Sequence, residues 1–230
     1  MLNLIRSLST LALLSWITCA SAADDRPNIL LVVADDLGWT DLGSYGGEIA
    51  TPNLDALAAE GIKFTDFHVS VSCSPTRSML MSGNDNHIAG LGNMGELLTD
   101  NQRGQPGYEG HLNDRVATLA EVLREGGYHT YMAGKWHLGH TKGSLPFDRG
   151  FDTSFSMLNG GASHWDDMLG ILPMDDPAKY SMNGELLDSL PADHYSSRSF
   201  ADFLMDSIRE NRGDGKPFLA YLAFQAVHDP

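Results

Sequence analysis

Apolar residues follow two different patterns along this chain, and the two patterns alternate. Some segments are nearly continuous apolar runs, typical of strands buried on both faces: Asn28–Ala34, Ile62–Val69, Tyr128–Ala133 and Pro217–Phe224. Others place apolar residues at helical spacing: Asn53–Glu60, Thr118–Glu125 and Ser197–Glu210. The alternation predicts an α/β fold with a central, mostly parallel sheet flanked by helices. It does not define the order of the strands in that sheet.

Two long stretches of a different composition separate these elements. Residues 82–113 are rich in Gly, Asn and Asp, and residues 142–191 contain several Gly and Pro. Loops of this length within a compact domain are more often functional than not. We therefore expect both stretches to line a pocket. His87, His164 and Trp165 are candidates for its wall, although ordinary loop packing explains each of them equally well.

The composition argues against a nucleic-acid-binding protein and against a disordered chain. Asp and Glu total 30 residues against 15 Lys and Arg, and this acidic balance argues against a nucleic-acid partner, whose binding requires clustered positive charge. The 42% hydrophobic and 20% charged residues are typical of a globular domain rather than a disordered acidic tail.

The first 22 residues have the pattern of a secretory signal peptide. A basic start at residues 1–6 precedes a mostly apolar run at residues 8–20, and the small residues at 20–22 fit a cleavage site. A lipid anchor on Cys19 is the weaker alternative. We predict a signal peptide at residues 1–22, a catalytic-domain portion at residues 23–230, and a periplasmic or secreted protein with no membrane attachment after signal removal.

Removal of the signal peptide leaves Cys73 as the single cysteine of the mature chain. An unpaired cysteine in an exported protein indicates an intermolecular disulfide, a reactive thiol or a modified residue, and a small buried apolar residue is the ordinary alternative. Pro75 fits the first turn of a helix, and Arg77 lies one turn beyond Cys73. A helix start and an arginine beside a nucleophile indicate an anion site, unless the cysteine is only structural.

Two carboxylates, Asp35 and Asp36, directly follow the first apolar run. Open α/β sheets place their ligand sites at this end of a strand. Adjacent carboxylates repel each other unless a cation offsets their charge, and oxygen ligands suit Ca²⁺ or Mg²⁺. A solvated turn or a helix N-cap is an equally good interpretation.

Further candidates follow two other predicted strands. Lys135 and His137 come after Tyr128–Ala133, and in an extended segment their side chains share one face. A permanent cation beside a group that titrates near neutral pH can bind an anion and move a proton. His228 follows the last apolar run. A single histidine is more often structural, but three strand ends together deliver Asp-Asp, Lys-x-His and His.

Two of these segments resemble signatures of the sulfatases, specifically of the formylglycine-dependent arylsulfatases of the alkaline phosphatase superfamily. The Cys73-x-Pro75-x-Arg77 core, closed by Gly83, is similar to the first signature of the family, in which the cysteine becomes formylglycine. The segment from Gly127 to His137 is similar to the second signature over its full length. The resemblance implies an alkaline-phosphatase-like fold.

The resemblance extends over the predicted mature chain, because the Asp35-Asp36 pair and His228-x-Pro230 occur in the family order. It implies that Asp35 and Asp36 bind Ca²⁺, with Mg²⁺ possible. It also implies that Cys73, as a formylglycine hydrate produced by a maturation enzyme, is the nucleophile, with one oxygen on the metal. The second hydroxyl of the hydrate lets a sulfated intermediate collapse to aldehyde and sulfate.

Roles for the remaining candidates follow from the same resemblance. Arg77 would hold the hydrate, and Lys135 would bridge the hydrate and the sulfate group. His137 would act as the base, and His228 would contact the ester.

Members of this family are considerably longer than 230 residues. Their remaining metal ligands, an Asp-Asn pair, and a second substrate lysine lie beyond the point that this sequence reaches. We therefore expect an N-terminal portion of the sulfatase fold, truncated before the C-terminal part and inactive by itself.

The expected activity is hydrolysis of a small-molecule sulfate monoester. Two alternatives are open at this stage. One is a phosphomonoester or phosphonate-ester hydrolase of the same superfamily, and the other is a truncated homologue that keeps the fold without catalysis.

Overall fold

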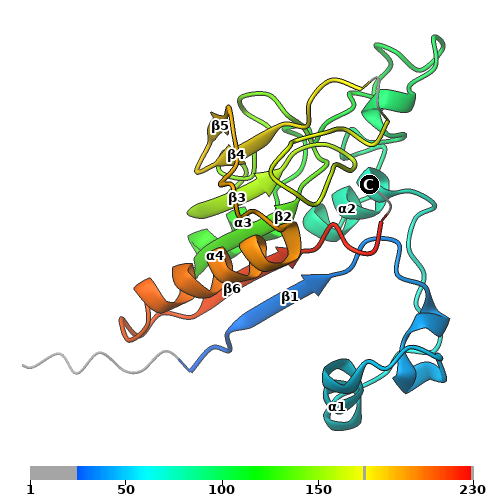
Figure 1. Ribbon diagram of the computed structural model, residues 1–230. Helices are drawn as coiled ribbons and strands as arrows, with labels where there is room; N and C mark the ends of the chain where they lie inside the picture. Colours follow the sequence, from blue (N-terminus) through cyan, green and yellow to red (C-terminus); the bar gives the residue numbers. More distant parts are fainter. Residues whose placement is uncertain (1–24, 173–174, 229–230) are drawn as a thin grey trace, which may run out of the picture.

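A six-stranded mixed sheet forms the centre of the protein (Figure 1). The computed structural model describes residues 25–172 and 175–228, so the predicted signal peptide lies outside the described residues. The strands are β1 (Ile29–Val33), β2 (His129–Lys135), β3 (Thr153–Met157), β4 (Tyr180–Met182), β5 (Glu185–Leu187) and β6 (Phe218–Ala223). The α-helices are α1 (Pro52–Glu60), α2 (Cys73–Ser82), α3 (Leu119–Glu125) and α4 (Ser196–Glu210), and short 3-10 helices are η1 (Trp39–Asp41), η2 (Gly43–Tyr45) and η3 (Gly95–Leu97).

The strand order is β1-β6-β2-β3-β4-β5. The first four strands of that order run parallel, and β4 and β5 add an antiparallel edge. The predicted α/β fold with a mostly parallel sheet is confirmed. Because β6 lies between β1 and β2, the last strand of the described chain is inserted between two earlier strands, and the carboxyl ends of these three strands lie side by side.

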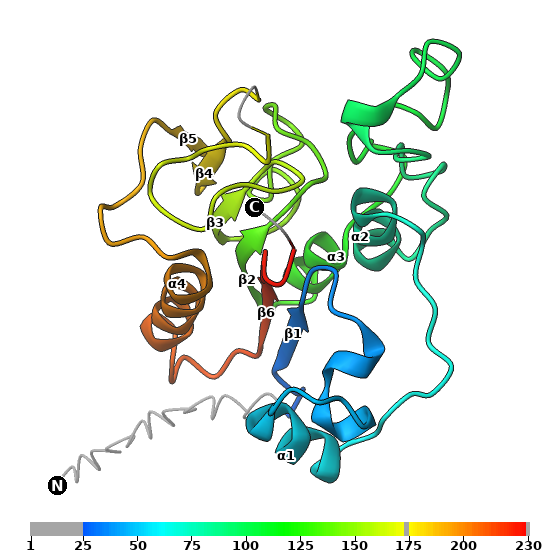
Figure 2. The ribbon, with the colours of Figure 1, turned by 45° about the vertical axis from the view of Figure 1, so that its right-hand side comes forward.

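Helices lie on both faces of the sheet around β2, whereas one face of the edge strand β1 is exposed (Figures 1 and 2). On one face, Phe200 and Leu204 of α4 pack with Tyr131 and Phe155 of the sheet. On the other face, Met81 of α2 packs in a second cluster with Tyr221 of β6 and with Trp136, which follows β2. Burial on both faces explains the apolar runs of β2 and β6. The prediction that the first apolar run is also buried on both faces is wrong, because β1 lies at the edge of the sheet and exposes Leu30 and Val32.

Residues at the helix termini explain where α3 begins and where α2 ends. Thr118 precedes α3 and accepts a hydrogen bond from the Glu121 amide, while Glu121 accepts one from the Thr118 amide, which is a capping box. Gly83 closes α2 in the left-handed conformation with φ of 65°. The prediction that Pro75 lies in the first turn of a helix is also confirmed.

Two predictions about secondary structure are wrong. Ile62–Val69 is not a strand, because the segment pairs with no strand among the described residues, and Phe64 and Phe67 are exposed. The stretch 142–191 is not only a connection, because it contains β3, β4 and β5. These strands do not form apolar runs, because β3 alternates Ser with apolar residues and β4 and β5 are only three residues long.

Residues 37–71, here called the N-terminal arm, lie apart from the sheet (Figure 2). The arm contains η1, η2 and α1, and none of these three elements has a buried residue. Within the part of the chain that the structure describes, no helix combines the length and apolar character needed to cross a bilayer.

Candidate active site

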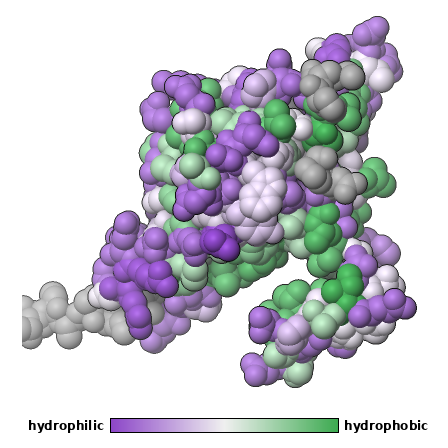
Figure 3. Space-filling view, in the orientation of Figure 1, coloured by the Kyte–Doolittle hydropathy of each residue, from purple (hydrophilic) through white to green (hydrophobic). Residues whose placement is uncertain are grey.

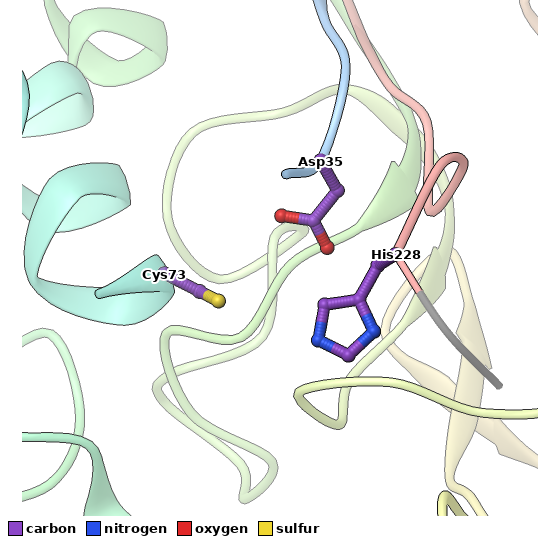
Figure 4. A group of neighbouring side chains, drawn as sticks. All are labelled: Asp35, Cys73 and His228. Atoms are coloured by element: carbon purple, nitrogen blue, oxygen red, sulfur yellow. The ribbon is translucent and has the colours of Figure 1, made fainter. Parts of the chain in front are cut away.

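The candidate residues from three strands and one helix meet at the carboxyl edge of the parallel strands. Asp35 follows β1, Lys135 ends β2, and His228 follows β6. Backbone hydrogen bonds continue from β1 and β6 beyond the strands: the Asp35 amide donates to the Ala226 carbonyl at 3.0 Å, and the Val227 amide donates to the Asp35 carbonyl at 2.9 Å. This extension holds His228 close to Asp35 (Figure 4).

Asp35 is a buried carboxylate between two buried cations. Its Oδ1 lies 3.0 Å from Nη2 of Arg77, and its Oδ2 lies 2.5 Å from Nζ of Lys135. Asp35, Arg77 and Lys135 are all at most 4% exposed. Burial raises the pKa of Asp35, but the charges of Arg77 and Lys135 outweigh burial and hold it below its usual value. The trio carries a net positive charge, which suits an anion.

Arg77 joins α2 to the sheet. Its Nη1 donates to the carbonyl oxygen of Lys135 at 2.9 Å and to the hydroxyl of Tyr221 at 3.3 Å. These contacts bring the first residues of α2 against the ends of β2 and β6. Because Arg77 lies one turn after Cys73, the same contacts locate the thiol.

Cys73 is the first residue of α2, and its side chain points toward Asp35 and His228 (Figure 4). One ligand atom from each of these three residues lies within 4.8 Å of the others. Free backbone N–H groups at the start of a helix favour negative charge on a nearby group. The structure therefore places the candidate nucleophile beside a carboxylate, an imidazole and a helix N-terminus.

Asp36 has a different environment from Asp35. Its side chain is exposed, its backbone is left-handed with φ of 58°, and its Oδ2 lies 3.8 Å from Nε2 of His228. The two carboxylates that are adjacent in sequence therefore diverge. Asp36 lies beside the group formed by Asp35, Cys73 and His228 rather than within it.

The donor set at this edge fits a divalent cation. Asp35 offers a carboxylate oxygen, His228 an imidazole nitrogen and Cys73 a sulfur atom, all within mutual reach. Carboxylate oxygens suit hard cations, whereas a thiol is a soft ligand. An oxygen in place of the Cys73 sulfur would give the set a second oxygen donor, which is the kind of ligand that hard cations prefer.

The prediction that Lys135 and His137 share one face of an extended segment is wrong. Strand β2 ends at Lys135, and His137 has φ of 55°, so alternation along a strand does not set its direction. Its Nε2 lies 2.8 Å from Oε1 of Glu96, a residue of η3. Burial lowers the pKa of His137, the charges of Lys135 and Arg77 lower it further, and Glu96 opposes them.

A cavity of about 680 Å³ lies next to these residues. Its walls include Ser74, Glu96, His137, His140 and Asn159, so both long loops contribute to it. The expectation that the loops line a pocket is confirmed. The other three residues proposed for the wall, His87, His164 and Trp165, do not line this cavity.

Each of those other residues has neighbours outside the cavity wall. His87 stacks edge-on against Tyr108, and His164 bonds to Ser196. Trp165 packs against Tyr195.

Three residues of the site, Glu96, Ser74 and Tyr221, were not identified from the sequence. Ser74 is a buried hydroxyl without a hydrogen-bond partner among the described residues, and it lines the cavity. Because Ser74 directly follows Cys73 in the sequence, its place in the site could have been predicted. Glu96 and Tyr221 carry no such signal, because their contacts join segments that are 41 and 144 residues apart.

Comparisons with known proteins agree with this geometry. A profile of the sulfatase family matches residues 27–230. An uncharacterized sulfatase of Schizosaccharomyces pombe is 48% identical over 223 residues, which cover 91% of this chain and 39% of that protein. The arylsulfatase of Klebsiella aerogenes is 42% identical, and the match covers 91% of this chain and 45% of that protein.

Solved structures give a consistent result. The crystal structure of Ps i-CgsB is 30% identical with a TM-score of 0.73, and the match covers 89% of this chain and 46% of that chain. PsFucS1 sulfatase from Pseudoalteromonas sp. is 26% identical with a TM-score of 0.67. This chain spans less than half the length of these relatives.

Proposed function

Because the chain belongs to the sulfatase family, we propose that this protein is an enzyme that hydrolyses sulfate monoesters at the carboxyl edge of its sheet. The observation that carries the proposal is the convergence of Cys73, Asp35 and His228 at the N-terminus of α2, with Arg77 and Lys135 directly behind Asp35. A sulfate ester is an anion, and two buried cations around one carboxylate leave positive charge for it. The relatives named as sulfatases and arylsulfatases support this activity over phosphate ester hydrolysis.

The nucleophile in this proposal is Cys73 after conversion to formylglycine by a maturation enzyme. The hydrated aldehyde supplies one hydroxyl to attack sulfur and a second hydroxyl through which sulfate can leave. Arg77 is the residue that holds this group in place, since it is fixed by Asp35, Lys135 and Tyr221.

Binding and proton transfer fall to three other side chains. The Nζ of Lys135 bridges the nucleophile and the sulfate group, and His228 contacts the ester oxygen. His137 acts as the base at Nδ1, because Nε2 already bonds to Glu96. The role of a base suits an imidazole whose pKa is lowered, since it is neutral at pH 7.

Asp35 and the modified Cys73, two members of the donor group, would hold a metal together with Asp36, whose carboxylate lies beside that group at 3.8 Å from Nε2 of His228. We propose that this metal is Ca²⁺, with Mg²⁺ as the other hard cation of suitable charge. A divalent cation at this position would polarise the sulfate and stabilise negative charge. We further propose that residues 1–22 direct export, so that the enzyme works in the periplasm or outside the cell.

The test uses the full-length protein and a matched pair of substrates, 4-nitrophenyl sulfate and 4-nitrophenyl phosphate. We expect faster hydrolysis of the sulfate, and we expect Cys73→Ala to abolish it. Mass spectrometry of the peptide that contains Cys73 should show replacement of one sulfur and two hydrogens by one oxygen. Met205→Leu, on the exposed side of α4, is the control and should retain full activity.

Two outcomes would contradict the proposal. A strong preference for the phosphate ester would indicate a phosphohydrolase. Unchanged hydrolysis by Cys73→Ala would mean that Cys73 is not the nucleophile.

A further inference from the structure

Glu96 contacts the proposed base from a distant part of the chain. It lies on η3, within the long stretch 82–113, and its Oε1 is 2.8 Å from Nε2 of His137. Its side chain is half exposed and forms part of the cavity wall. This carboxylate is therefore placed between the solvent-accessible cavity and one nitrogen of the imidazole.

The contact determines which nitrogen of His137 carries the proton. An ionised carboxylate only accepts hydrogen bonds. Partial burial raises the pKa of Glu96, but the hydrogen bond and charge of His137 outweigh burial and hold that pKa below its usual value. Glu96 is thus ionised at pH 7 and requires a proton on Nε2. The neutral imidazole then has its lone pair on Nδ1.

Nδ1 of His137 is the atom left for chemistry. It is buried and has no hydrogen-bond partner among the described residues. Buried polar atoms in folded proteins are nearly always paired, so an orphaned atom that belongs to a cavity wall indicates a partner supplied by a ligand. Ser74 lines the same cavity, and its buried hydroxyl also has no hydrogen-bond partner in the part of the chain that the structure describes.

Gly160 restricts the pair sterically. A Cβ at this position would lie 2.8 Å from Cε1 and 3.0 Å from Nε2 of His137, and 3.1 Å from Oε1 of Glu96. The backbone of residue 160 therefore packs directly against both side chains, which keeps the imidazole in one orientation. The arrangement leaves little freedom for His137 to rotate away from Glu96.

We propose that Glu96 is a positioning residue for sulfate ester hydrolysis: its carboxylate orients His137 and keeps the proton on Nε2, so that Nδ1 accepts a proton in the cavity. This inference rests on the proposed function only in its use of His137 as the base. Glu96 itself does not touch the reacting atoms. It acts through the imidazole, as carboxylates that hold catalytic histidines do.

The first test compares Glu96→Gln with Glu109→Gln in the full-length enzyme. Glu109 lies in the same long stretch and pairs with Arg115 at 2.9 Å, so its replacement removes the same charge from the same loop without touching His137. We expect Glu96→Gln to lower kcat for 4-nitrophenyl sulfate by about 10- to 100-fold with a smaller effect on KM. Glu109→Gln should behave as the unmodified enzyme does.

The pH dependence supplies a readout that loss of structure would not mimic. The charged groups that act on His137 are Glu96, which raises its pKa, and Lys135 and Arg77, which lower it. Without the Glu96 charge, the pKa of His137 falls further, and the imidazole stays neutral at lower pH. The acidic limb of the profile of kcat/KM should therefore move to lower pH in Glu96→Gln and should not move in Glu109→Gln.

The tautomer can be measured without activity. Long-range ¹H–¹⁵N correlation spectra of the ¹⁵N-histidine-labelled enzyme should show His137 protonated on Nε2 near pH 7, and a mixture of tautomers in Glu96→Gln. A His137 protonated on Nδ1 in the unmodified enzyme would overturn the inference, as would a Glu96→Gln variant with unchanged kcat and pH profile.

These outcomes are separable from failure of the proposed function. If the unmodified enzyme does not hydrolyse the sulfate ester, the proposed function fails, whereas the tautomer spectra still decide what Glu96 does to His137. If the enzyme is active and Cys73→Ala is inactive, an effect of Glu96→Gln no larger than that of Glu109→Gln overturns the role of Glu96 alone.

Discussion

The segment around β2 and the N-terminal arm are both rich in apolar residues, yet they differ completely in burial. Every residue of β2 after His129 is buried, as are Trp136 and His137 beyond it. In the arm, Ile62 is 84% exposed, and Val71 is fully exposed. Figure 3 shows the arm as a separate lobe with apolar side chains on its surface. Apolar content alone therefore did not decide which segment joined the core.

Pairing explains the difference. Strand β2 has a parallel neighbour on each side, β6 and β3, so its backbone groups are satisfied and helices cover both faces. The segment 62–71 has no strand partner among the described residues, so its apolar side chains remain in contact with solvent. The site is therefore built on the part of the chain whose strands are paired and covered.

The largest expected effect comes from Gly134 in β2. This residue has φ of 113° and pairs with Ala223, and a Cβ would lie 1.8 Å from the Ala223 carbonyl oxygen. Gly134→Ala must push β2 away from β6, so we expect a loss of more than about 4 kcal/mol in the free energy of unfolding, or no soluble protein.

The matched control for this glycine is Gly143→Ala. Gly143 also has a positive φ, of 91°, but among the described residues no heavy atom beyond its chain neighbours lies within 4 Å of the position that a Cβ would take. The substitution should cost only backbone strain, about 1 kcal/mol. Equal losses in urea unfolding for the two variants would show that the close approach of β2 and β6 is unimportant.

The second largest effect is expected for the buried ion pair between Arg77 and Asp35. Arg77→Met removes one of the two cations that pair with Asp35 and leaves Lys135 as the other. It also removes the hydrogen bond that Arg77 donates to the Lys135 carbonyl. Breaking one partner of a buried pair costs roughly 3 kcal/mol. Urea unfolding in the presence of a chelator measures this cost without a contribution from bound metal.

The control for Arg77→Met is Arg209→Met. Arg209 forms an ion pair with Asp206 in which both side chains are about two-thirds exposed. Its loss should change the unfolding free energy by less than about 0.5 kcal/mol. A similar loss of unfolding free energy for both variants would mean that the buried Arg77–Asp35 pair contributes no more to stability than the exposed Arg209–Asp206 pair.

The smallest expected effect lies in the arm. Leu57 in α1 is 68% exposed, so Leu57→Ser should change the unfolding free energy by less than about 0.5 kcal/mol. Leu204→Ser in α4, where the side chain is 2% exposed, should instead cost at least about 3 kcal/mol. A loss above about 1 kcal/mol for Leu57→Ser would show that the arm packs against other parts of the protein.

Much of the fold could be predicted where local signals agree. The predicted helix at Thr118–Glu125 and α3 differ by a single residue, because Thr118 and Glu121 cap the helix and Gly126 ends it. The prediction of α4 is similarly accurate, because four apolar residues recur at helical spacing over 15 residues. The strand predicted at Ile62–Val69 failed, because an apolar run carries no information about whether a neighbouring strand exists.

The candidate site shows the same limit. Cys73, Asp35, Lys135 and His228 were identifiable, because each follows a strand or begins a helix, and parallel strands end at a common edge. Their chemistry is therefore a property of local sequence. The pairing of Asp35 with Arg77 and Lys135 was not predictable, since it depends on β6 lying between β1 and β2.

The sequence by itself determined the alternation of strands and helices, the ends of the helices and the residue types at each strand end. These features depend on backbone preference, side-chain periodicity and capping, all of which act over a few residues. The tertiary structure decided the strand order, the exposure of the arm and the contact of Glu96 with His137. Those features depend on which distant segments satisfy one another's hydrogen bonds and cover one another's apolar faces, and that choice is made by the whole chain at once.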